Sequence, residues 1–131
     1  MERRTHVITI PGELPGLNEV IAMSKSHYGR YSQSKRRHTE TVAWLAKQLP
    51  AMERADIAIH WHCKSKRRDK DNIATGAKYV LDGLVMAGVI RTDGWKHIGG
   101  ITHTFSVDKA NPRIEVELRE VGHATSQPVD R

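Results

Sequence analysis

The sequence predicts an α+β fold in which a small mixed β-sheet of about four strands packs against two α-helices. Its 131 residues are the length of one ordinary domain, and its 38% hydrophobic residues suffice for one core. Four short stretches alternate apolar and polar side chains, as half-buried strands do, and two longer stretches repeat apolar side chains at helical spacing. The order is strand, helix, strand, helix, strand, strand, which is typical of a sheet covered by helices.

The first part of the chain predicts a strand, a long loop and a helix. The strand covers residues 7–10 and ends at a Pro-Gly pair. Residues 11–34 are rich in Gly, Ser, Asn and Tyr, so we expect a long loop, and loops of this length in small domains usually carry function. A helix is expected over residues 34–49, before Pro50, which cannot continue it. Apolar residues of this helix recur at helical spacing, namely Val42, Leu45, Ala46 and Leu49.

The middle of the chain predicts a second strand and a second helix. Residues 56–63 alternate, and one face of this strand carries Ile57, Ile59, Trp61 and Cys63. We expect a helix over residues 72–86, with Asp71 or Asn72 as its N-cap and Gly88 as its C-terminal stop. Two internal glycines weaken this helix by up to about 1 kcal/mol each relative to alanine, namely Gly76 and Gly83.

The last part of the chain predicts two strands and a tail. The strands cover residues 101–107 and 113–119, and Asn111-Pro112 supplies the turn between them. Residues 1–120 therefore form one domain, and residues 121–131 are expected to be a flexible C-terminal tail.

The basic residues are clustered. Lys and Arg total 21 and Asp and Glu total 15, so the net charge is +6. Residues 1–70 hold 14 basic and 7 acidic side chains, a net of +7, whereas residues 71–131 hold 7 and 8, a net of −1. Ten of the basic residues fall within residues 25–37 and 64–70. A clustered positive surplus favours a polyanionic partner, most often nucleic acid.

Several classes of protein are excluded. No apolar run approaches the ~18 residues that span a bilayer, and the N-terminus lacks the apolar stretch of a signal peptide, so no membrane partner is expected. The single cysteine, Cys63, cannot form an internal disulfide or a cysteine-rich metal site. We expect it to be a buried thiol and the chain to act in a reducing, cytoplasmic compartment.

The most informative stretch is residues 66–72, Lys-Arg-Arg-Asp-Lys-Asp-Asn. In an extended segment Asp69 and Asp71 point the same way, and two carboxylates on one side repel unless a cation lies between them. Mg²⁺ is the obvious cation, because it prefers oxygen ligands and keeps waters that can be activated. Spacing alone leaves open the alternative of a plain charged turn.

Asp93 is a third candidate carboxylate. A helix over residues 72–86 spans roughly 21 Å, and residues 87–93 reach at most roughly 25 Å when extended. A return to Asp69 and Asp71 is therefore just possible within one chain, and otherwise Asp93 faces a partner's site in a dimer.

Lys78 is the candidate basic residue on the second helix. It flanks the apolar stripe, from where it can reach a substrate, or it forms an ordinary ion pair with Asp82 four residues further on. The N-terminus of this helix also presents N–H groups that suit a phosphate.

These segments, taken in order, resemble the RusA family of Holliday-junction resolvases. The matching residues are the run Arg68-Asp69-Lys70-Asp71-Asn72, then Lys78, then Leu81-Asp82-Gly83-Leu84, then Ala87-Gly88-Val89-Ile90, and finally Asp93-Gly94-Trp95. An N-terminal strand that ends in Pro-Gly, followed by a basic loop with Asn18, is similar in layout. The resemblance covers about residues 5–119.

The resemblance implies a RusA-like fold and a homodimeric endonuclease, of bacterial or phage origin, that acts in DNA recombination and repair. Such enzymes bind four-way junctions and nick two opposing strands with Mg²⁺, for which Mn²⁺ is a substitute. Asp69, Asp71 and Asp93 match the family's metal-binding catalytic aspartates, and Lys78 matches its helix lysine. The interval from Asp71 to Lys78 is longer than in the family, which makes Lys70 a rival. The family often has two aspartates at the third position, where this chain has Thr92-Asp93.

The clustered cations would hold the junction arms through phosphate contacts that weaken strongly with salt. The expected DNA-binding residues are Arg30, Lys35, Arg36, Arg37, Lys66, Arg67, Arg68 and Lys70. Tyr28 and Tyr31 either stack on unpaired bases or pack within the loop. Three tryptophans are expected in the core or at an interface, namely Trp44, Trp61 and Trp95.

Two other classes of function stay open. A non-catalytic DNA-binding module would use the same cations and would need neither the carboxylates nor Mg²⁺. A zinc hydrolase would use His60, His62 and Cys63, but Cys63 points to the opposite face of the predicted strand from the two histidines.

Overall fold

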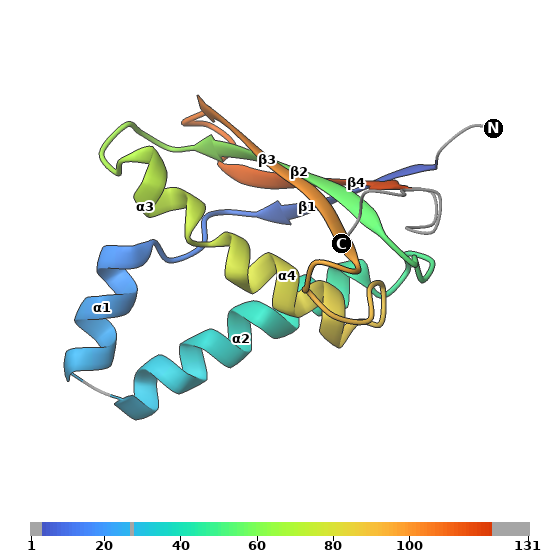
Figure 1. Cartoon of the computed structure of the whole chain (residues 1–131). Helices are drawn as coiled ribbons and strands as arrows, with labels where there is room; N and C mark the ends of the chain where they lie inside the picture. Colours follow the sequence, from blue (N-terminus) through green and yellow to red (C-terminus); the bar gives the residue numbers. More distant parts are fainter. Residues whose placement is uncertain (1–3, 27, 122–131) are drawn as a thin grey trace.

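The computed structural model describes residues 4–26 and 28–121, and it shows the α+β fold that the sequence predicts. One mixed sheet forms a layer, and the helices of the described residues lie on one side of it (Figure 1). The elements follow the chain as β1 (Thr5–Pro11), α1 (Leu17–Ser26), α2 (Tyr28–Ala46), β2 (Ala55–Cys63), α3 (Lys70–Ala74), α4 (Ala77–Met86), β3 (Ile98–Val107) and β4 (Arg113–Glu120).

The sheet has the strand order β1-β4-β2-β3. β4 pairs antiparallel with β1 and with β2, whereas β3 runs parallel to β2. A parallel pair needs a crossover connection, and here it consists of α3, α4 and the loop that follows them. The C-terminal ends of β2 and β3 therefore meet at the same edge of the sheet.

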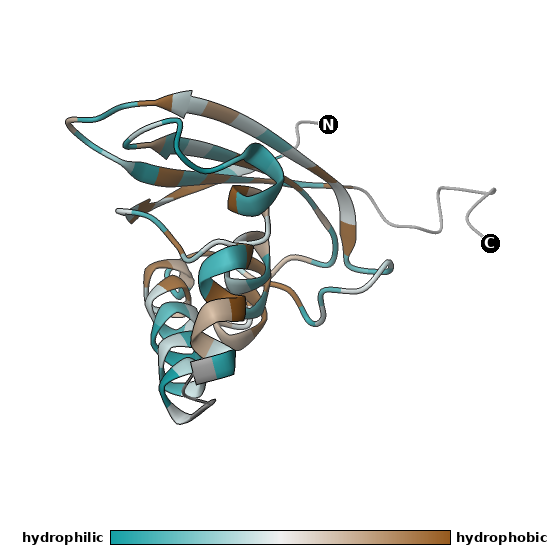
Figure 2. Cartoon of the chain, turned by 90° about the vertical axis from the view of Figure 1, so that its left-hand side faces the viewer, coloured by the Kyte–Doolittle hydropathy of each residue, from teal (hydrophilic) through white to brown (hydrophobic). Residues whose placement is uncertain are grey.

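The core lies between the sheet and the helices. Every second residue of β2 and β4 is buried against the helix layer, and the alternation of apolar and polar residues along the strands is visible in Figure 2. The predicted alternation over residues 56–63 and 113–119 is confirmed. The largest fully buried side chains come from both layers, namely Ile57, Ile59, Val116 and Leu118 of the sheet and Val42, Val80 and Leu84 of the helices.

The predicted loop over residues 11–34 is wrong. Residues 17–26 form α1, and α2 begins at Tyr28 rather than at residue 34 and ends at Ala46 rather than at 49. The first turn of α1 is capped in part by the distant Asn72, whose side-chain oxygen accepts the Asn18 N–H at 3.0 Å. A cap that comes from 54 residues away leaves no local signal.

The predicted helix over residues 72–86 is two helices, α3 and α4, with Thr75 and Gly76 between them. The predicted N-cap is also wrong, because α3 begins at Lys70 and Asp69 occupies the N-cap without a side-chain cap. The predicted stop is confirmed. Gly88 has a φ of +79°, its N–H donates to the Val85 carbonyl and the Val89 N–H donates to the Leu84 carbonyl, which is a complete Schellman motif.

Of the predicted tail, residues 122–131 lie outside the described residues. Among the helices of the described segments, none is long and apolar enough to cross a membrane.

Candidate functional site

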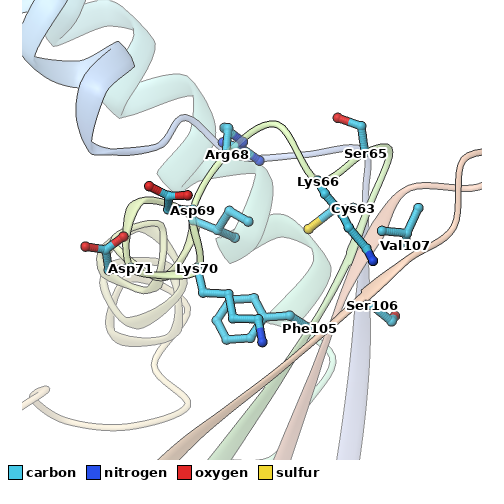
Figure 3. A pocket seen from close by; sticks show the side chains of 11 residues that line it. Cys63, Ser65, Lys66, Arg68, Asp69, Lys70, Asp71, Phe105, Ser106 and Val107 are labelled. Carbon is cyan, nitrogen blue, oxygen red and sulfur yellow. The ribbon is translucent and has the colours of Figure 1, made fainter.

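The loop between β2 and α3 carries the predicted carboxylates to the rim of a cavity of about 780 Å³. The cavity lies where β2 and β3 end, and Figure 3 shows the side chains that line it. They come from the end of β2, the connecting loop, α3 and the last residues of β3, namely Cys63, Ser65, Lys66, Arg68, Asp69, Lys70, Asp71, Ile73, Phe105, Ser106 and Val107.

Asp69 and Asp71 point to the same side of this segment, as predicted, although the segment is not fully extended. Asp69 has extended backbone angles at the N-cap, and Asp71 lies in the first turn of α3. Figure 3 shows both carboxylates on one side, while Lys70 points the opposite way, toward Phe105. The Lys70 ammonium lies 5.8 Å from the centre of that ring. The two carboxylates are therefore adjacent, exposed and on the side away from Lys70.

This pair fits Mg²⁺, a hard cation that binds proteins through one or two carboxylates and keeps several waters. One Asp71 oxygen accepts the N–H of Asn72 at 2.8 Å, which fixes that carboxylate at the start of α3. No third ligand joins the pair: within the described residues, no three His, Cys, Asp or Glu side chains gather closely enough to hold a metal ion.

Asp93 lies beside Lys78 rather than beside the other two aspartates. The loop after α4 runs back along the helix, as the length argument allows, but only to its first turn. There the Lys78 ammonium lies 3.0 Å from an Asp93 oxygen and 3.1 Å from an Asp82 oxygen. The hydrogen bond to Asp93, followed by the one to Asp82, raises the pKa of Lys78. Lys78 therefore makes the ordinary helix pair with Asp82 and also binds the candidate catalytic carboxylate.

A second cavity, of about 730 Å³, opens beside this ion cluster. Its walls combine α2, α4 and the loop that follows α4, and they include Lys35, Arg36, Lys78, Asp82, Arg91 and Asp93. The predicted cations of residues 25–37 therefore lie on helices and not in a loop, with Lys25 on α1 and the others on α2. Arg30, Lys35, Arg36 and Arg37 are all exposed on α2. The catalytic candidates Lys78 and Asp93 share a cavity with two of them.

The cations of the β2–α3 loop divide into two kinds. Lys66, Arg67 and Lys70 are exposed. Arg68 instead turns back into the protein, with one guanidinium nitrogen 3.0 Å from the Leu14 carbonyl and 3.1 Å from Glu19, and the other 3.6 Å from Glu13. Arg68 was expected to bind DNA, but its guanidinium joins the loop to the segment before α1.

Asn72 makes a second connection to α1 that sequence reasoning missed. Its side chain caps α1, and Gly16 approaches it so closely that a Cβ there would lie 2.7 Å from the Asn72 side-chain oxygen. Glu19 completes the cap, because its carboxylate accepts the Gly16 N–H at 2.6 Å. The only local signal for this contact is a glycine directly before a helix.

The predicted tryptophans, the cysteine and the tyrosines differ in burial. Trp61 is buried, whereas Trp44 and Trp95 are 67% and 95% exposed, so neither lies in the core of the chain. Cys63 is a buried thiol, as expected, and burial raises its pKa. The Tyr28 side chain lies outside the described part of the chain, and Tyr31 is half-buried on α2.

The zinc alternative has no support in the geometry. His60 and His62 lie on the open face of the sheet, where they contact Thr104, Ser106 and Glu115. Cys63 is buried on the helix side of the same strand. The three predicted zinc ligands therefore lie on two faces of the sheet.

Comparisons with known proteins give no assignment. No model of a known protein family matches the chain, and no curated protein matches its sequence. The functional argument therefore rests on the residues and their geometry.

Proposed function

We propose that this chain is a Mg²⁺-dependent endonuclease that resolves four-way DNA junctions by paired nicks, in DNA recombination and repair, as the resemblance to the RusA family implies. The observation that carries the proposal is the adjacent, exposed pair of Asp69 and Asp71 at the rim of a cavity. Carboxylates within a basic surface weaken phosphate binding unless a cation lies between them and the DNA. Their position supports a metal-dependent reaction on a phosphate.

Asp69 and Asp71 would hold the metal, with Asp93 as the third carboxylate of the proposal. When bound, Mg²⁺ lowers the pKa of a water and neutralises charge on the scissile phosphate. In the structure the Asp93 carboxylate accepts the hydrogen bond of the Lys78 ammonium and lines a different cavity from Asp69 and Asp71, so this role requires Asp93 to move. Asp82, the second carboxylate on Lys78, can keep the lysine in place when Asp93 moves.

Lys78 and Lys70 are the two candidates for the catalytic lysine. Lys78 is charged at neutral pH, its pKa is raised further by hydrogen bonds to Asp93 and Asp82, and it lies in the same cavity as Lys35 and Arg36. A charged ammonium there can bind the phosphate or balance the negative charge that develops on it. Lys70 points toward Phe105 inside the first cavity, away from the aspartate pair. This arrangement favours Lys78.

The exposed cations supply the DNA contacts in this proposal. Arg30, Lys35, Arg36 and Arg37 form a basic side of α2, and Lys66, Arg67 and Lys70 lie by the aspartates. Phosphate contacts of this kind position DNA without reading its sequence. Arg68 is left out of this set because its guanidinium already has three partners within the chain.

The test is cleavage of a labelled four-way junction at low salt, with Mg²⁺ or with EDTA. We expect paired symmetric nicks that require Mg²⁺ and disappear in Asp71→Asn while junction binding is retained. Glu117→Gln is the matched control, because Glu117 is an exposed carboxylate on the opposite face of the sheet. Lys78→Ala should abolish cleavage and Lys70→Ala should reduce it far less. Cleavage that survives Asp71→Asn would contradict the site.

The second candidate function is a non-catalytic DNA-binding module, which the basic side of α2 favours on its own. It predicts tight junction binding, no cleavage with Mg²⁺, and binding that improves when Asp69 or Asp71 is neutralised, because a repulsive charge is removed. The same assay therefore separates the two functions.

A further inference from the structure

A row of three stacked rings crosses from β2 to β3 and ends in the cavity that carries Asp69 and Asp71. The ring centres of Trp61 and His103 lie 6.0 Å apart with the planes at 14°, and those of His103 and Phe105 lie 6.2 Å apart at 18°. The Trp61 indole also donates a hydrogen bond to His103 at 2.9 Å. Trp61 is buried, whereas Phe105 is half-buried and lines the cavity. The row therefore ends at a ring that is supported from behind and accessible from the cavity.

The cavity is apolar around this ring. Ile73 of α3 and Val107 at the end of β3 line it together with Phe105, and Val107 is 47% exposed. The volume of about 780 Å³ lies within the range of roughly 300–1,000 Å³ that is usual for small-molecule sites. Apolar surface that stays in contact with water in a hollow of this size favours a ligand with an apolar face.

Two lysines of the cavity are available for an anion. Lys66 and Lys70 both line it, both are exposed, and neither has a carboxylate partner among the described residues. Arg68, which also lines the cavity, is by contrast bound to two glutamates. The Lys70 ammonium lies 5.8 Å from the centre of the Phe105 ring, close to the limit of about 6 Å for a cation–π contact, so it can leave the ring at little cost. An anion here would not have to break an ion pair.

We propose that this cavity binds one unpaired nucleotide, with its base against the Phe105 ring and its phosphate at Lys66 and Lys70. Every nucleobase has a flat π-face that can stack on an aromatic side chain, and the phosphate next to it is an anion. The aromatic wall and the two ammonium groups are thus matched together, which neither a free phosphate nor an apolar molecule would do. A base within a duplex is stacked and paired, so only an unpaired base can enter.

Such a nucleotide site deepens the proposed nuclease function, on which its biological role rests. Asp69 and Asp71 lie at the rim of the same cavity, on the side away from Lys70 (Figure 3). A strand whose base lies on Phe105 would therefore run through the cavity that carries the aspartate pair. The site would select DNA that has an unpaired base, as at a branch point, over continuous duplex. Phe105 would be a specificity-determining residue that binds no metal.

Binding of a short, fluorescently labelled oligothymidylate to the full chain tests the site, with anisotropy measured at low salt in EDTA. Phe105→Leu should weaken binding by about tenfold or more, because the stacking of a base on an aromatic ring is lost. Phe105→Tyr keeps a ring and should bind as the unmodified chain does. Trp44→Leu is the matched control, because Trp44 is an exposed ring with the Lys47 ammonium at 3.7 Å, but it lies on α2 and outside the cavity. It should leave the affinity unchanged.

An abasic oligomer of the same length separates the base from the phosphates. It carries the same charge but has nothing to stack, so it should bind the unmodified chain as weakly as oligothymidylate binds Phe105→Leu. Phe105→Leu should not weaken the binding of the abasic oligomer any further, which distinguishes the lost ring from a general loss of structure. The double variant Lys66→Gln, Lys70→Gln should weaken the binding of both oligomers, because both carry phosphates.

Two results would overturn the nucleotide site. One is equal affinity of the unmodified chain for oligothymidylate and for the abasic oligomer, since the cations alone would then account for binding. The other is a Phe105→Leu variant that binds oligothymidylate as tightly as the unmodified chain does. None of these measurements involves Mg²⁺ or cleavage, so a chain that binds the base through Phe105 and cuts no DNA would support this site and contradict only the nuclease proposal.

Discussion

Arg68 and Asn72, which flank the aspartate pair, hold its loop against the segment that begins α1. Arg68 bonds the Leu14 carbonyl and two glutamates, and Asn72 caps the first turn of α1. Both residues belong to the run that resembles the RusA family. Their contacts give them a structural role that is independent of DNA, because they fix the direction in which Asp69 and Asp71 leave the loop.

Substitution of Arg68 should therefore lower stability, whereas substitution of its neighbour should not. We expect Arg68→Ala to lower the free energy of unfolding by about 1–3 kcal/mol, because it leaves partly buried acceptors without their charged donor. Arg67→Ala, at an exposed position on the same loop, should change it by less than about 0.5 kcal/mol. Urea unfolding measures both. Equal losses in the two variants would show that the Arg68 contacts contribute little.

The same pair of arginines shows what sequence could and could not predict about the site. Spacing predicted that Asp69 and Asp71 point the same way, because that depends only on local backbone. From composition alone, Arg67 and Arg68 were both predicted to bind DNA. The difference between them comes from Glu13 and Glu19, about fifty residues earlier in the chain, and no local pattern reports such a contact.

Lowering the pH should decrease the stability of the fold, because it protonates two carboxylates on the open face of the sheet. Hydrogen bonds from His62 and Arg113 hold the pKa of Glu115 below its usual 4.5, and one from Arg113 holds that of Asp108 below 3.8. Because both pKa values are lower in the folded state, the stabilisation is complete above the usual values and is lost as the pH falls through the lowered ones.

We therefore expect the urea midpoint of the unmodified chain to fall as the pH drops below 4.5, and to fall less steeply in Arg113→Gln. Lys109→Gln, which removes an exposed cation from the same turn, should keep the original pH dependence. An acid profile of Arg113→Gln that parallels that of the unmodified chain would show that Arg113 does not stabilise the ionised carboxylates.

At the scale of elements, the close crossing of α2 and α4 depends on Gly83. A Cβ at this position would lie 2.5 Å from side-chain atoms of Val42, which is closer than packed atoms can approach. Helix propensity alone favours alanine here, but the crossing reverses that preference. Gly83 thus lets the helix that carries Lys78 pack directly against the helix that carries the basic residues.

Gly83→Ala should accordingly lower the free energy of unfolding by about 1–3 kcal/mol, because Val42 and the backbone of α2 must shift. Gly29→Ala, at a helical glycine with open space around it, should leave stability unchanged or raise it by up to about 1 kcal/mol. Thermal unfolding of both variants is the measurement. A stabilised Gly83→Ala would show that the two helices can separate at little cost.

The helices and strands that could be predicted are those whose sequence pattern depends only on neighbouring residues. The strands over residues 56–63 and 113–119 show in the sequence because one side faces the core and the other does not. α1 was missed because Pro15 and Gly16 precede it and because part of its cap comes from the distant Asn72. The break between α3 and α4 was missed because the apolar stripe continues through it, although Gly76 stands at that position.

On the scale of the whole molecule, the strand order could not be predicted, since it depends on which strands pair across long connections. That order positions the candidate site. It places β3 parallel to β2, so the C-terminal ends of both strands lie beside one cavity. It also leaves one face of the sheet without a helix among the described residues, and the cations divide between the two faces.

The cations of the two faces differ in their partners, and this leads to a prediction about DNA binding. On the open face, Arg113 and Arg119 are paired with carboxylates. On the helix side, Lys35 and Arg36 are exposed beside a cavity and have no carboxylate partner within the described ranges. Phosphates can therefore replace solvent around the helix-side cations without breaking an ion pair, so DNA should bind to the helix side.

Junction binding measured without Mg²⁺ over a range of salt concentrations tests this polarity. The double variant Lys35→Gln, Arg36→Gln should bind more weakly and should reduce the slope of log affinity against log salt by about 2, because two phosphate contacts are lost. Arg119→Gln, which removes a paired cation from the open face, should leave the slope unchanged. A slope that falls in Arg119→Gln and not in the double variant would place the DNA on the open sheet instead. It would then separate the bound strand from Asp69 and Asp71, so no reaction at those aspartates could follow from binding.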